Sequence, residues 1–260
     1  MIDLSDYSFQ KLCEDGEFIV SRGRRTGDSA SILLQAASSE HPSRTSIDRI
    51  NHAYSLRNEL DSDWAIRPRT LVDRGGIPAL LLDDPGGDFL DGVLGRSPSL
   101  KELLRLAIAI TNALGRLHAR RLIHRDVKPA NVIAKTSTGE AWLTGFGLTS
   151  RLPRHRQPPE PPEVIAGTLA YMAPEQTGRM NRSIDSRSDL YSLGITLYEM
   201  FVGALPFMAG DAMGWVHCHI ARLPVAPSLR KAEIPEPLSA IILKLLAKAS
   251  EERYQTAAGV

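Results

Sequence analysis

The pattern of hydrophobic positions changes character near residue 85. Before that point, short apolar runs separated by polar turns predict a β-meander over residues 10–36, with a turn at residues 22–29, and a hairpin over residues 71–82. Between them, apolar positions at three- and four-residue steps predict one helix over residues 47–60. The first part of the chain is therefore predicted to be a sheet accompanied by a single helix.

In the rest of the chain the apolar positions mostly recur at helical spacing. Ser99 and Glu102 have the spacing of a capping box, and a broad apolar stripe runs from them toward His118, which predicts a long core helix. Strands first and mostly helices afterwards indicate an α+β fold with two lobes and a cleft between them. The other predicted elements are a short hairpin over residues 131–144 and helices over residues 188–201, 211–221 and 238–249.

A polar segment that is hostile to helices, residues 84–88, separates the two parts and is predicted to be a hinge. We place the lobe boundary there. The small lobe would comprise residues 1–85 and the large lobe residues 86–260. Together they would form one domain.

Composition narrows the class of protein. The chain has 260 residues, 43% of them hydrophobic, which suits a sizeable core. Thirty-one basic against thirty acidic residues give a net charge of +1, so bulk charge offers no attraction to nucleic acid. Its two cysteines form no disulfide framework, and no apolar run approaches the roughly 18 residues of a membrane span. We therefore expect a cytoplasmic location, with neither a nucleic-acid nor a membrane partner.

The segment from His124 to Asn131 combines a carboxylate, two cations and a carboxamide between two apolar runs. Asp126 can accept or orient a hydroxyl proton, Lys128 can bind a phosphate oxygen, and Asn131 offers an oxygen to magnesium. Phosphoryl transfer requires such groups. These three residues are therefore predicted to be catalytic, with Asn131 also a metal ligand. The alternative is a polar turn without chemistry between a helix and a hairpin.

The order of these residues resembles a known family. His-Arg-Asp followed after four residues by Asn resembles the catalytic loop of protein kinases, and the lysine two residues after the aspartate resembles the Ser/Thr branch. Ala-Pro-Glu at residues 173–175 resembles the end of a kinase activation segment. The chain is thus similar to bacterial Ser/Thr protein kinases from residue 100 onward. Residues 166–199 look closest to the amino-terminal kinase-like module of large signalling proteins with ATPase and sensor histidine kinase segments.

The resemblance implies a bilobal protein-kinase fold, ATP and magnesium as cofactors, and further site residues. Thr168 resembles the threonine that bridges the catalytic aspartate and lysine, and the resemblance adds it to the predicted catalytic residues. Asp189 resembles the aspartate that caps the backbone of the catalytic loop. Arg253 resembles the arginine that pairs with the glutamate of Ala-Pro-Glu. The residues with implied structural roles are His124, Arg125, Phe146, Gly147, Glu175, Asp189 and Arg253.

The chain departs from the family at the metal site. Kinases hold magnesium with the aspartate of an Asp-Phe-Gly motif, and here that position is Gly145. Phe146 and Gly147 follow it and fix the alignment. Because glycine supplies no side-chain oxygen, Asn131 would stand alone among the usual protein ligands, and metal binding is predicted to be weak.

The residues that hold the nucleotide in the family are also missing. The strand at residues 31–36 should carry a lysine, and its polar equivalent is Gln35, which has no charge. The position of the lysine's partner glutamate falls on Ala53. One glycine of the glycine-rich loop remains, Gly16, among acids that would repel phosphate: Glu14, Asp15 and Glu17. Gly16, Gln35 and Gly145 mark the predicted cofactor site, where ATP and magnesium are expected to bind weakly or not at all.

Two further stretches of the sequence concern regulation by phosphorylation and metal binding. Arg125 resembles a catalytic-loop arginine that meets a phosphorylated residue, yet residues 152–166 contain no Ser, Thr or Tyr. We hypothesise that Glu160 or Glu163 takes that place. His-Cys-His at residues 217–219 falls in a predicted helix, where adjacent side chains face different ways, so we do not predict a metal site there.

Three functions fit these observations. The missing groups favour a signalling pseudokinase that docks to a protein partner or to downstream domains of a longer chain. The intact catalytic residues favour an active Ser/Thr kinase, with ATP and magnesium held by unconventional groups. A small-molecule phosphotransferase is disfavoured, because the complete Ala-Pro-Glu region shapes a peptide platform in protein kinases. We expect the first, in a chain cut within the last helix of the family fold.

Overall fold

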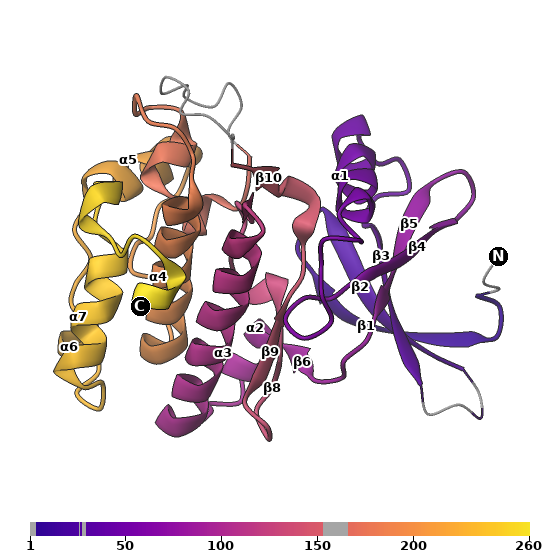
Figure 1. The fold of residues 1–260 in the computed structure, drawn as a ribbon, viewed down its shortest axis with the longest axis horizontal. Helices are drawn as coiled ribbons and strands as arrows, with labels where there is room; N and C mark the ends of the chain where they lie inside the picture. Colours follow the sequence, from indigo (N-terminus) through magenta and orange to yellow (C-terminus); the bar gives the residue numbers. More distant parts are fainter. Residues whose placement is uncertain (1–3, 26, 28–29, 153–165) are drawn as a thin grey trace.

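The computed structural model describes residues 4–25, 27, 30–152 and 166–260. These residues form a β-rich small lobe with one main helix and a larger, mostly helical lobe (Figure 1). The α+β architecture with two lobes that the sequence predicts is confirmed.

The small lobe is built on a five-stranded antiparallel sheet in the order β1-β2-β3-β5-β4. Its strands are β1 (Tyr7–Glu14), β2 (Phe18–Arg25), β3 (Ser31–Ala37), β4 (Pro68–Asp73) and β5 (Pro78–Asp83). The predicted meander and hairpin are confirmed. However, β2 extends into the predicted turn, because its last residues pair with both β1 and β3. Side chains alternate along β3, so Leu33 enters the main core while Ile32 and Leu34 pack in a second cluster on the other face.

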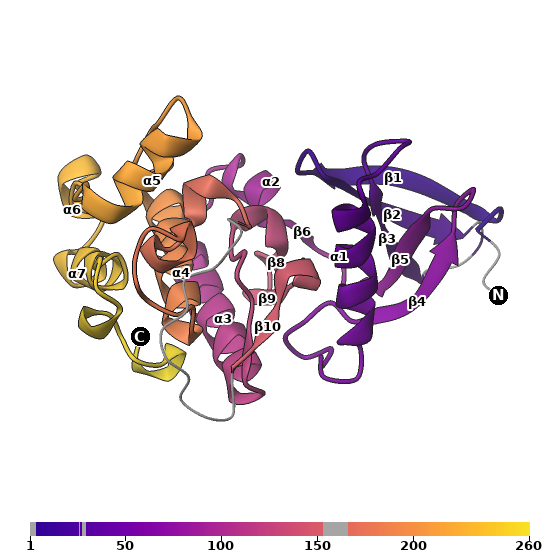
Figure 2. The ribbon, with the colours of Figure 1, turned by 90° about the horizontal axis from the view of Figure 1, so that it is seen from above.

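Helix α1 (Arg44–Ser55) lies between the sheet and the large lobe (Figure 2). It begins before the predicted residue 47 because Ser43 caps it, with Ser43 Oγ accepting a hydrogen bond from the N–H of Ser46 at 3.1 Å. It ends before the predicted residue 60, since tighter turns replace the helical hydrogen bonds after Ser55. Leu60 is buried in the loop that follows.

The large lobe contains the helices α2 (Leu90–Leu94), α3 (Leu100–Ala119), α4 (Ser186–Val202), α5 (Ala212–Ala221), α6 (Pro227–Arg230) and α7 (Glu236–Leu245). The predicted helix from residue 100 is confirmed with its capping box. The short helices α2 and α6 were not predicted, because they span too few residues to show a period. In the described part of the chain, no helix combines the length and the apolar character needed to cross a membrane.

Two small sheets of the large lobe lie on its side toward the small lobe (Figures 1 and 2). One has the order β6-β8-β9, with β6 (Asp88–Phe89), β8 (Val132–Lys135) and β9 (Glu140–Leu143), and the other pairs β7 (Leu122–Ile123) with β10 (Ser150–Arg151). The strands β8 and β9 confirm the predicted hairpin over residues 131–144. The 3-10 turns are η1 (Pro129–Asn131), η2 (Phe146–Leu148), η3 (Leu169–Tyr171), η4 (Pro174–Thr177), η5 (Ser250–Glu252) and η6 (Ala257–Gly259).

Helix α4 is the buried centre of the large lobe, since most of its residues are buried, polar ones included. Asp185 caps its start by accepting a hydrogen bond from the N–H of Arg187 at 2.8 Å. Gly203 follows its last turn with a φ of 86°, a conformation that glycine adopts without strain. The helix thus has defined ends, and it places Asp189 beneath the cleft.

Helix α7 lies a few residues earlier than predicted. It begins early because Pro235 and Pro237 occupy its start, where a missing N–H breaks no helical bond. It ends early because the chain then turns to meet Arg253, whose Nε donates to the carbonyl of Ala247 at 2.8 Å. The contact between Arg253 and Ala247 forms outside the helix, so it leaves no periodic signal in the sequence.

Candidate active site

The loop that begins at His124 is held in place by Asp189 of α4. The fully buried carboxylate of Asp189 accepts hydrogen bonds from the N–H groups of His124 and Arg125, both at 2.8 Å. It also contacts Nε2 of His118 at 2.8 Å. Arg125 has a φ of 69°, which residues other than glycine rarely adopt, so these bonds hold an unusual loop shape. The predicted capping contact of Asp189 is confirmed.

The ring of His124 is fully buried, and both of its nitrogens are occupied. Its Nε2 donates to the carbonyl of Thr144 at 2.8 Å, and its Nδ1 accepts the N–H of Asp126 at 3.3 Å. The ring packs against Phe146, with centroids 5.2 Å apart. Burial lowers the pKa of His124, against the opposing effect of Asp189 and Asp126, so the ring is neutral at pH 7. His124 shapes the loop and has no nitrogen free to shuttle protons.

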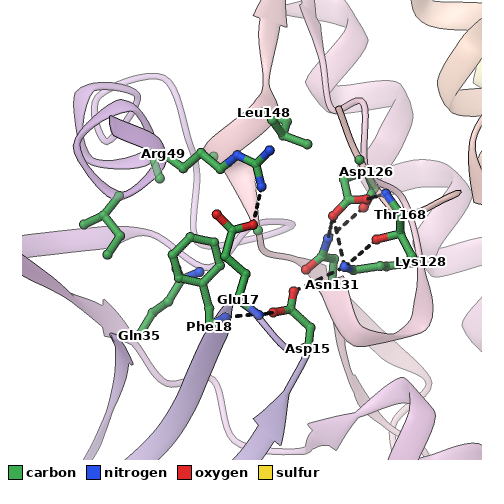
Figure 3. A pocket seen from close by; sticks show the side chains of 15 residues that line it. Asp15, Glu17, Phe18, Gln35, Arg49, Asp126, Lys128, Asn131, Leu148 and Thr168 are labelled. Atoms are coloured by element: carbon green, nitrogen blue, oxygen red, sulfur yellow. Dashed lines mark hydrogen bonds and ion pairs between the residues drawn. The ribbon is translucent and has the colours of Figure 1, made fainter. Parts of the chain in front are cut away.

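Asp126, Lys128, Asn131 and Thr168 meet at the cleft between the lobes (Figure 3). Lys128 Nζ donates to Thr168 Oγ1 at 2.7 Å and lies 3.1 Å from Asp126 Oδ2. The N–H of Thr168 donates to Asp126 Oδ1 at 3.0 Å, and Asn131 Nδ2 donates to Asp126 Oδ2 at 2.9 Å. The four residues that the sequence marks as catalytic therefore form one polar group around the carboxylate of Asp126.

The two charged members of this group stabilise each other. Burial alone would raise the pKa of Asp126, but Lys128, His124 and the N–H of Thr168 bring it below its usual value. Burial alone would lower the pKa of Lys128, but Asp126 and Asp15 raise it above its usual value. Both side chains are charged at neutral pH. Asp126 is thus in the state needed to accept or orient a hydroxyl proton.

Asp15 of the small lobe also reaches Lys128. It lies in the turn between β1 and β2, and its Oδ2 is 3.2 Å from Lys128 Nζ. Its Oδ1 accepts hydrogen bonds from the N–H groups of Glu17 at 3.2 Å and Phe18 at 2.9 Å. The sequence predicts only that acids in this turn repel phosphate. In the structure, Asp15 is paired with the lysine predicted to bind a phosphate oxygen.

The three predicted cofactor positions are placed differently. Gln35 and Gly145 line the cleft, and Gln35 lies on β3 opposite Leu80 of β5. Gly16, with a φ of 85°, shapes the turn, while its neighbours Asp15 and Glu17 line the cleft. Gly16 itself is not among the residues that line the cavity, and its role in cofactor binding stays a prediction.

Asn131 fills the space beside Gly145. Gly145 has the left-handed conformation, with φ of 78° and ψ of 37°. A Cβ added there would lie 2.4 Å from Oδ1 and 2.5 Å from Cγ of Asn131, far closer than real carbon contacts. Asn131 is held in this position by Asp126, to whose carbonyl its Nδ2 also donates at 2.7 Å. A side chain at position 145 would therefore require Asn131 to move.

The sequence interpretation missed one charged residue of the cleft, Arg49 of α1. Its guanidinium points into the cleft and forms an ion pair with Glu17 (Figure 3). Ala53, where the family's glutamate was expected, lines the cleft one helical turn further along. A Cβ on Gly147 would lie 3.0 Å from Cβ of Arg49, so this glycine lets α1 approach η2 closely. The sequence did contain a signal for Arg49, because it lies four residues before Ala53 and therefore on the same face of the helix.

Glu175 and Arg253 form the predicted ion pair. Arg253 Nη1 and Nη2 donate to the two carboxylate oxygens of Glu175 at 2.7 and 2.9 Å. Ser188 Oγ donates to Glu175 Oε1 at 2.7 Å. Both charged side chains are almost completely buried, with exposures of 0% and 2%. The bidentate pair ties the end of the activation segment to the region after α7, and the prediction is confirmed.

The lobe linker uses its polar groups internally. Arg22 of β2 donates to both carboxylate oxygens of Asp84, at 2.6 and 3.1 Å, and to the carbonyl of Gly87 at 2.7 Å. Asp84 also accepts the N–H of Gly86 at 2.9 Å. Pro85 has no N–H to offer. These bonds use one backbone N–H and one backbone carbonyl of the linker.

The space between the lobes is small and divided. The cavity around Asp126, Lys128 and Arg49 has a volume of about 280 Å³. A second cavity nearer the linker, lined by Phe18 and Phe89 among others, has only about 20 Å³. That is room for about one water molecule.

Two predictions concern other parts of the chain. Glu160 and Glu163, the proposed partners of Arg125, lie outside the described residues. In the described part of the chain, Arg125 Nε is buried and has no hydrogen-bond partner. In the His-Cys-His sequence on α5, His217 is exposed whereas Cys218 and His219 are buried, so His217 faces away from the other two side chains. Within the described residues, no group of three or more His, Cys, Asp or Glu side chains is placed to hold a metal.

Comparison with known proteins agrees with the geometry of the cleft. The model of the protein kinase domain matches residues 84–259. The chain therefore belongs to the protein kinase family, and the motifs above place it with bacterial Ser/Thr kinases.

Three curated relatives illustrate this placement. The chain is 33% identical over 188 residues to a probable serine/threonine-protein kinase of Streptomyces coelicolor, covering 72% of this chain and 28% of that protein. It is 38% identical over 186 residues to the serine/threonine-protein kinase PknB of Mycolicibacterium smegmatis, covering 71% and 29%. It is 32% identical over 184 residues to Pkn1 of Myxococcus xanthus, covering 70% and 26%. The chain thus matches less than a third of the length of these relatives.

Proposed function

We propose that this chain is a degenerate signalling domain of the Ser/Thr protein kinase family, with weak or absent phosphoryl transfer and a role in regulation or docking. The observation that carries the proposal is the contact between Asn131 and Gly145. The position of the family's metal-binding carboxylate is a glycine, and the carboxamide of Asn131 fills the space beside it.

The donor groups at the cleft fit magnesium poorly. Protein-bound magnesium usually has one or two carboxylates together with nucleotide oxygens. Here the Asp126 carboxylate already accepts hydrogen bonds from Asn131 and Thr168 and pairs with Lys128. Gly145 adds no oxygen. Metal-assisted transfer of the family's kind therefore lacks its dedicated protein carboxylate.

The cleft is also poorly suited to a nucleotide. Three carboxylates and two cations line it, which leaves it with a net negative charge toward a polyanion. Gln35 occupies β3 where the family resemblance leads us to expect a lysine. The cavity near the linker has room for about one water molecule, so a base would have to displace the rings of Phe18 and Phe89. Each of these features weakens nucleotide binding for a separate physical reason.

The proposal extends to the setting of the domain. We place it in the cytoplasm, at the amino-terminal end of a larger signalling protein with ATPase and sensor histidine kinase segments. There it would bind a protein partner or those downstream domains. The resemblance of residues 166–199 to the kinase-like module of such proteins supports this setting.

A second function is an active Ser/Thr kinase that holds metal and ATP atypically. The bonds among Asp126, Lys128 and Thr168 favour it, because they keep a charged carboxylate at the place where a substrate hydroxyl would be oriented. A docking domain has no evident need for all three groups.

Thermal unfolding with millimolar ATP, with and without magnesium, distinguishes the two functions. A ligand that binds the folded state raises the melting temperature. The degenerate domain should show no magnesium-dependent rise, whereas an active kinase measured in parallel should show one. A rise of several degrees that requires both ATP and magnesium would support the second function.

A further inference from the structure

The turn between β1 and β2, residues 15–17, is called here the acidic turn, and it is firmly attached to the small lobe. Ser38, just after β3, donates from its Oγ to the carbonyl of Gly16 at 2.8 Å and from its N–H to the carbonyl of Glu17 at 3.0 Å. Glu17 also forms an ion pair with Arg49 of α1. The acidic turn is therefore tied to both the sheet and the helix of the small lobe.

The side chain of Asp15 reaches from the acidic turn to the large lobe (Figure 3). Its Oδ2 lies 3.2 Å from Lys128 Nζ, and the two side chains are only 25% and 8% exposed. Its Oδ1 accepts the N–H groups of Glu17 and Phe18, which fix the direction of the carboxylate. Because Lys128 also pairs with Asp126, one partly buried cation joins a carboxylate from each lobe.

A separate junction between the lobes is made by backbone groups. The N–H of Ile66, in the loop before β4, donates to the carbonyl of Leu143 of β9 at 2.8 Å. The N–H of Leu143 donates to the carbonyl of Trp64 at 2.9 Å. These bonds do not depend on side-chain charge. The lobes can stay attached here while the acidic turn moves away from Lys128, which is the geometry of a hinge.

We propose that the acidic turn is a latch, in which the ion pair between Asp15 and Lys128 holds the two lobes closed without a ligand. Many enzymes close their lobes or lids only when a bound substrate bridges them. In this chain its own side chains provide the bridge. The closed latch also covers Lys128, so this group becomes accessible only when the lobes separate. The inference goes beyond the proposed function, because it concerns lobe movement and holds whether or not phosphate is transferred.

Cys13 of β1 lies beside the latch and can report its state. Its Sγ is 3.9 Å from Asp91 Oδ2 of α2, which belongs to the large lobe. Burial, Asp91 and Asp15 raise the pKa of the Cys13 thiol to about 12, and Lys128 opposes them. Since the thiolate is the reactive form, Cys13 should react slowly in the closed state and faster when the lobes separate.

The test is the rate at which iodoacetamide alkylates Cys13 in the 260-residue chain, measured by mass spectrometry of its peptides. Lys128→Met should raise this rate about tenfold, roughly the effect of losing one charge-assisted hydrogen bond from the closed state. A local charge effect predicts the reverse, because loss of the lysine raises the pKa of Cys13 further and slows alkylation. The direction of the change therefore separates opening of the lobes from local electrostatics.

A second pair of variants tests the latch from the small lobe. Asp15→Asn keeps an oxygen for the two N–H groups of the turn and loses only the charge. Of the two acids, Asp91 raises the pKa of Cys13 more than Asp15 does. Local electrostatics thus predicts a larger gain in rate from Asp91→Asn, whereas the latch predicts a larger gain from Asp15→Asn. The double variant Asp15→Asn/Lys128→Met should exceed Lys128→Met by no more than about twofold, since both changes break one ion pair.

Two controls separate opening of the latch from other effects. Cys218 is 5% exposed within the large lobe, and its alkylation reports global unfolding, so its rate should stay unchanged. Glu14→Gln removes the acid next to Cys13, whose ion pair with Lys11 stays within β1. This variant should change the rate at Cys13 by less than about twofold, as expected for an exposed charge.

A rate at Cys13 that is unchanged or lower in Lys128→Met, with Cys218 still protected, would overturn the inference. A double variant whose gain equals the product of the two single gains would also overturn it. If Lys128→Met exposes both cysteines, the chain unfolds and the comparison of Asp15→Asn with Asp91→Asn decides; an equal or larger gain from Asp91→Asn then rejects the latch. None of these results depends on nucleotide or on phosphoryl transfer, so failure here is distinct from failure of the proposed function.

Discussion

The carboxamide of Asn131 lies against the backbone of Gly145, where a Cβ would come within 2.4 Å of its Oδ1. In a kinase of the usual type, both positions would serve the same metal ion. Here one has lost its side chain and the other fills the space. The loss of the metal ligand at position 145 is thus accompanied by repacking of Asn131. Restoring a carboxylate at position 145 alone would not restore the metal site.

The first prediction compares two glycines with similar positive φ angles, 85° at Gly16 and 78° at Gly145. Gly16→Ala should lower the free energy of unfolding by about 1 kcal/mol, the strain of a left-handed alanine, because its added Cβ meets no atom within 4 Å. Gly145→Ala should lower it by about 3 kcal/mol, because overpacking against Asn131 is added to the same strain. Urea unfolding measures both. Equal losses would mean that Asn131 moves freely and does not block position 145.

The second prediction concerns the buried pair of Glu175 and Arg253. Glu175→Gln leaves the arginine charged and buried, and should lower the free energy of unfolding by about 3 to 5 kcal/mol. The control is Glu251→Gln, which breaks the more exposed pair with Arg182 and should cost less than about 1 kcal/mol. Chemical unfolding compares the two variants. Similar losses would show that the buried pair is not a structural tie.

The third prediction is a loss of stability in acid through His219. Its Nδ1 accepts from Tyr191 Oη at 3.0 Å, and its Nε2 donates to the carbonyl of Leu169 at 2.8 Å. Burial lowers the pKa of His219 to about 4, the bond to Leu169 opposes this, and Lys248 adds to it. Between about pH 6.5 and 4 the unfolded state binds more protons, so the free energy of unfolding should fall by roughly 3 kcal/mol.

The matched variant for this prediction is His219→Gln, which can keep one donor and one acceptor but does not titrate. Its free energy of unfolding should fall less steeply over the same pH range. A residual slope is expected, because burial also lowers the pKa of His124. An identical slope in both proteins would assign the acid sensitivity to other groups.

Much of the site could be predicted because its residues are close in sequence or lie at motif spacing. Asp126, Lys128 and Asn131 are separated by a few residues, and the structure brings them together in one polar group. The contacts of Asp189 and Glu175 were also predicted, although they join distant segments. In those cases the family resemblance supplied the long-range pairing that periodicity alone does not contain.

The remaining features depend on how the two lobes face each other. Helical periodicity points to Ala53 and gives no reason to single out Arg49, because an arginine on a helix is usually solvated. From the sequence, Asp15 is only a charge that repels phosphate, since no local pattern shows that Lys128, 113 positions away, is its partner. Such pairs are fixed by the approach of one lobe to the other, and a single sequence carries little signal for them.

The most direct test of the central claim is transfer of labelled phosphate from ATP, with magnesium, to the chain itself and to generic protein substrates. Asp126→Asn serves as the control, because it removes the group that would orient a hydroxyl. The account predicts that the unmodified chain transfers no more phosphate than this variant. Transfer that is clear in the unmodified chain and absent in Asp126→Asn would contradict it and identify an active kinase.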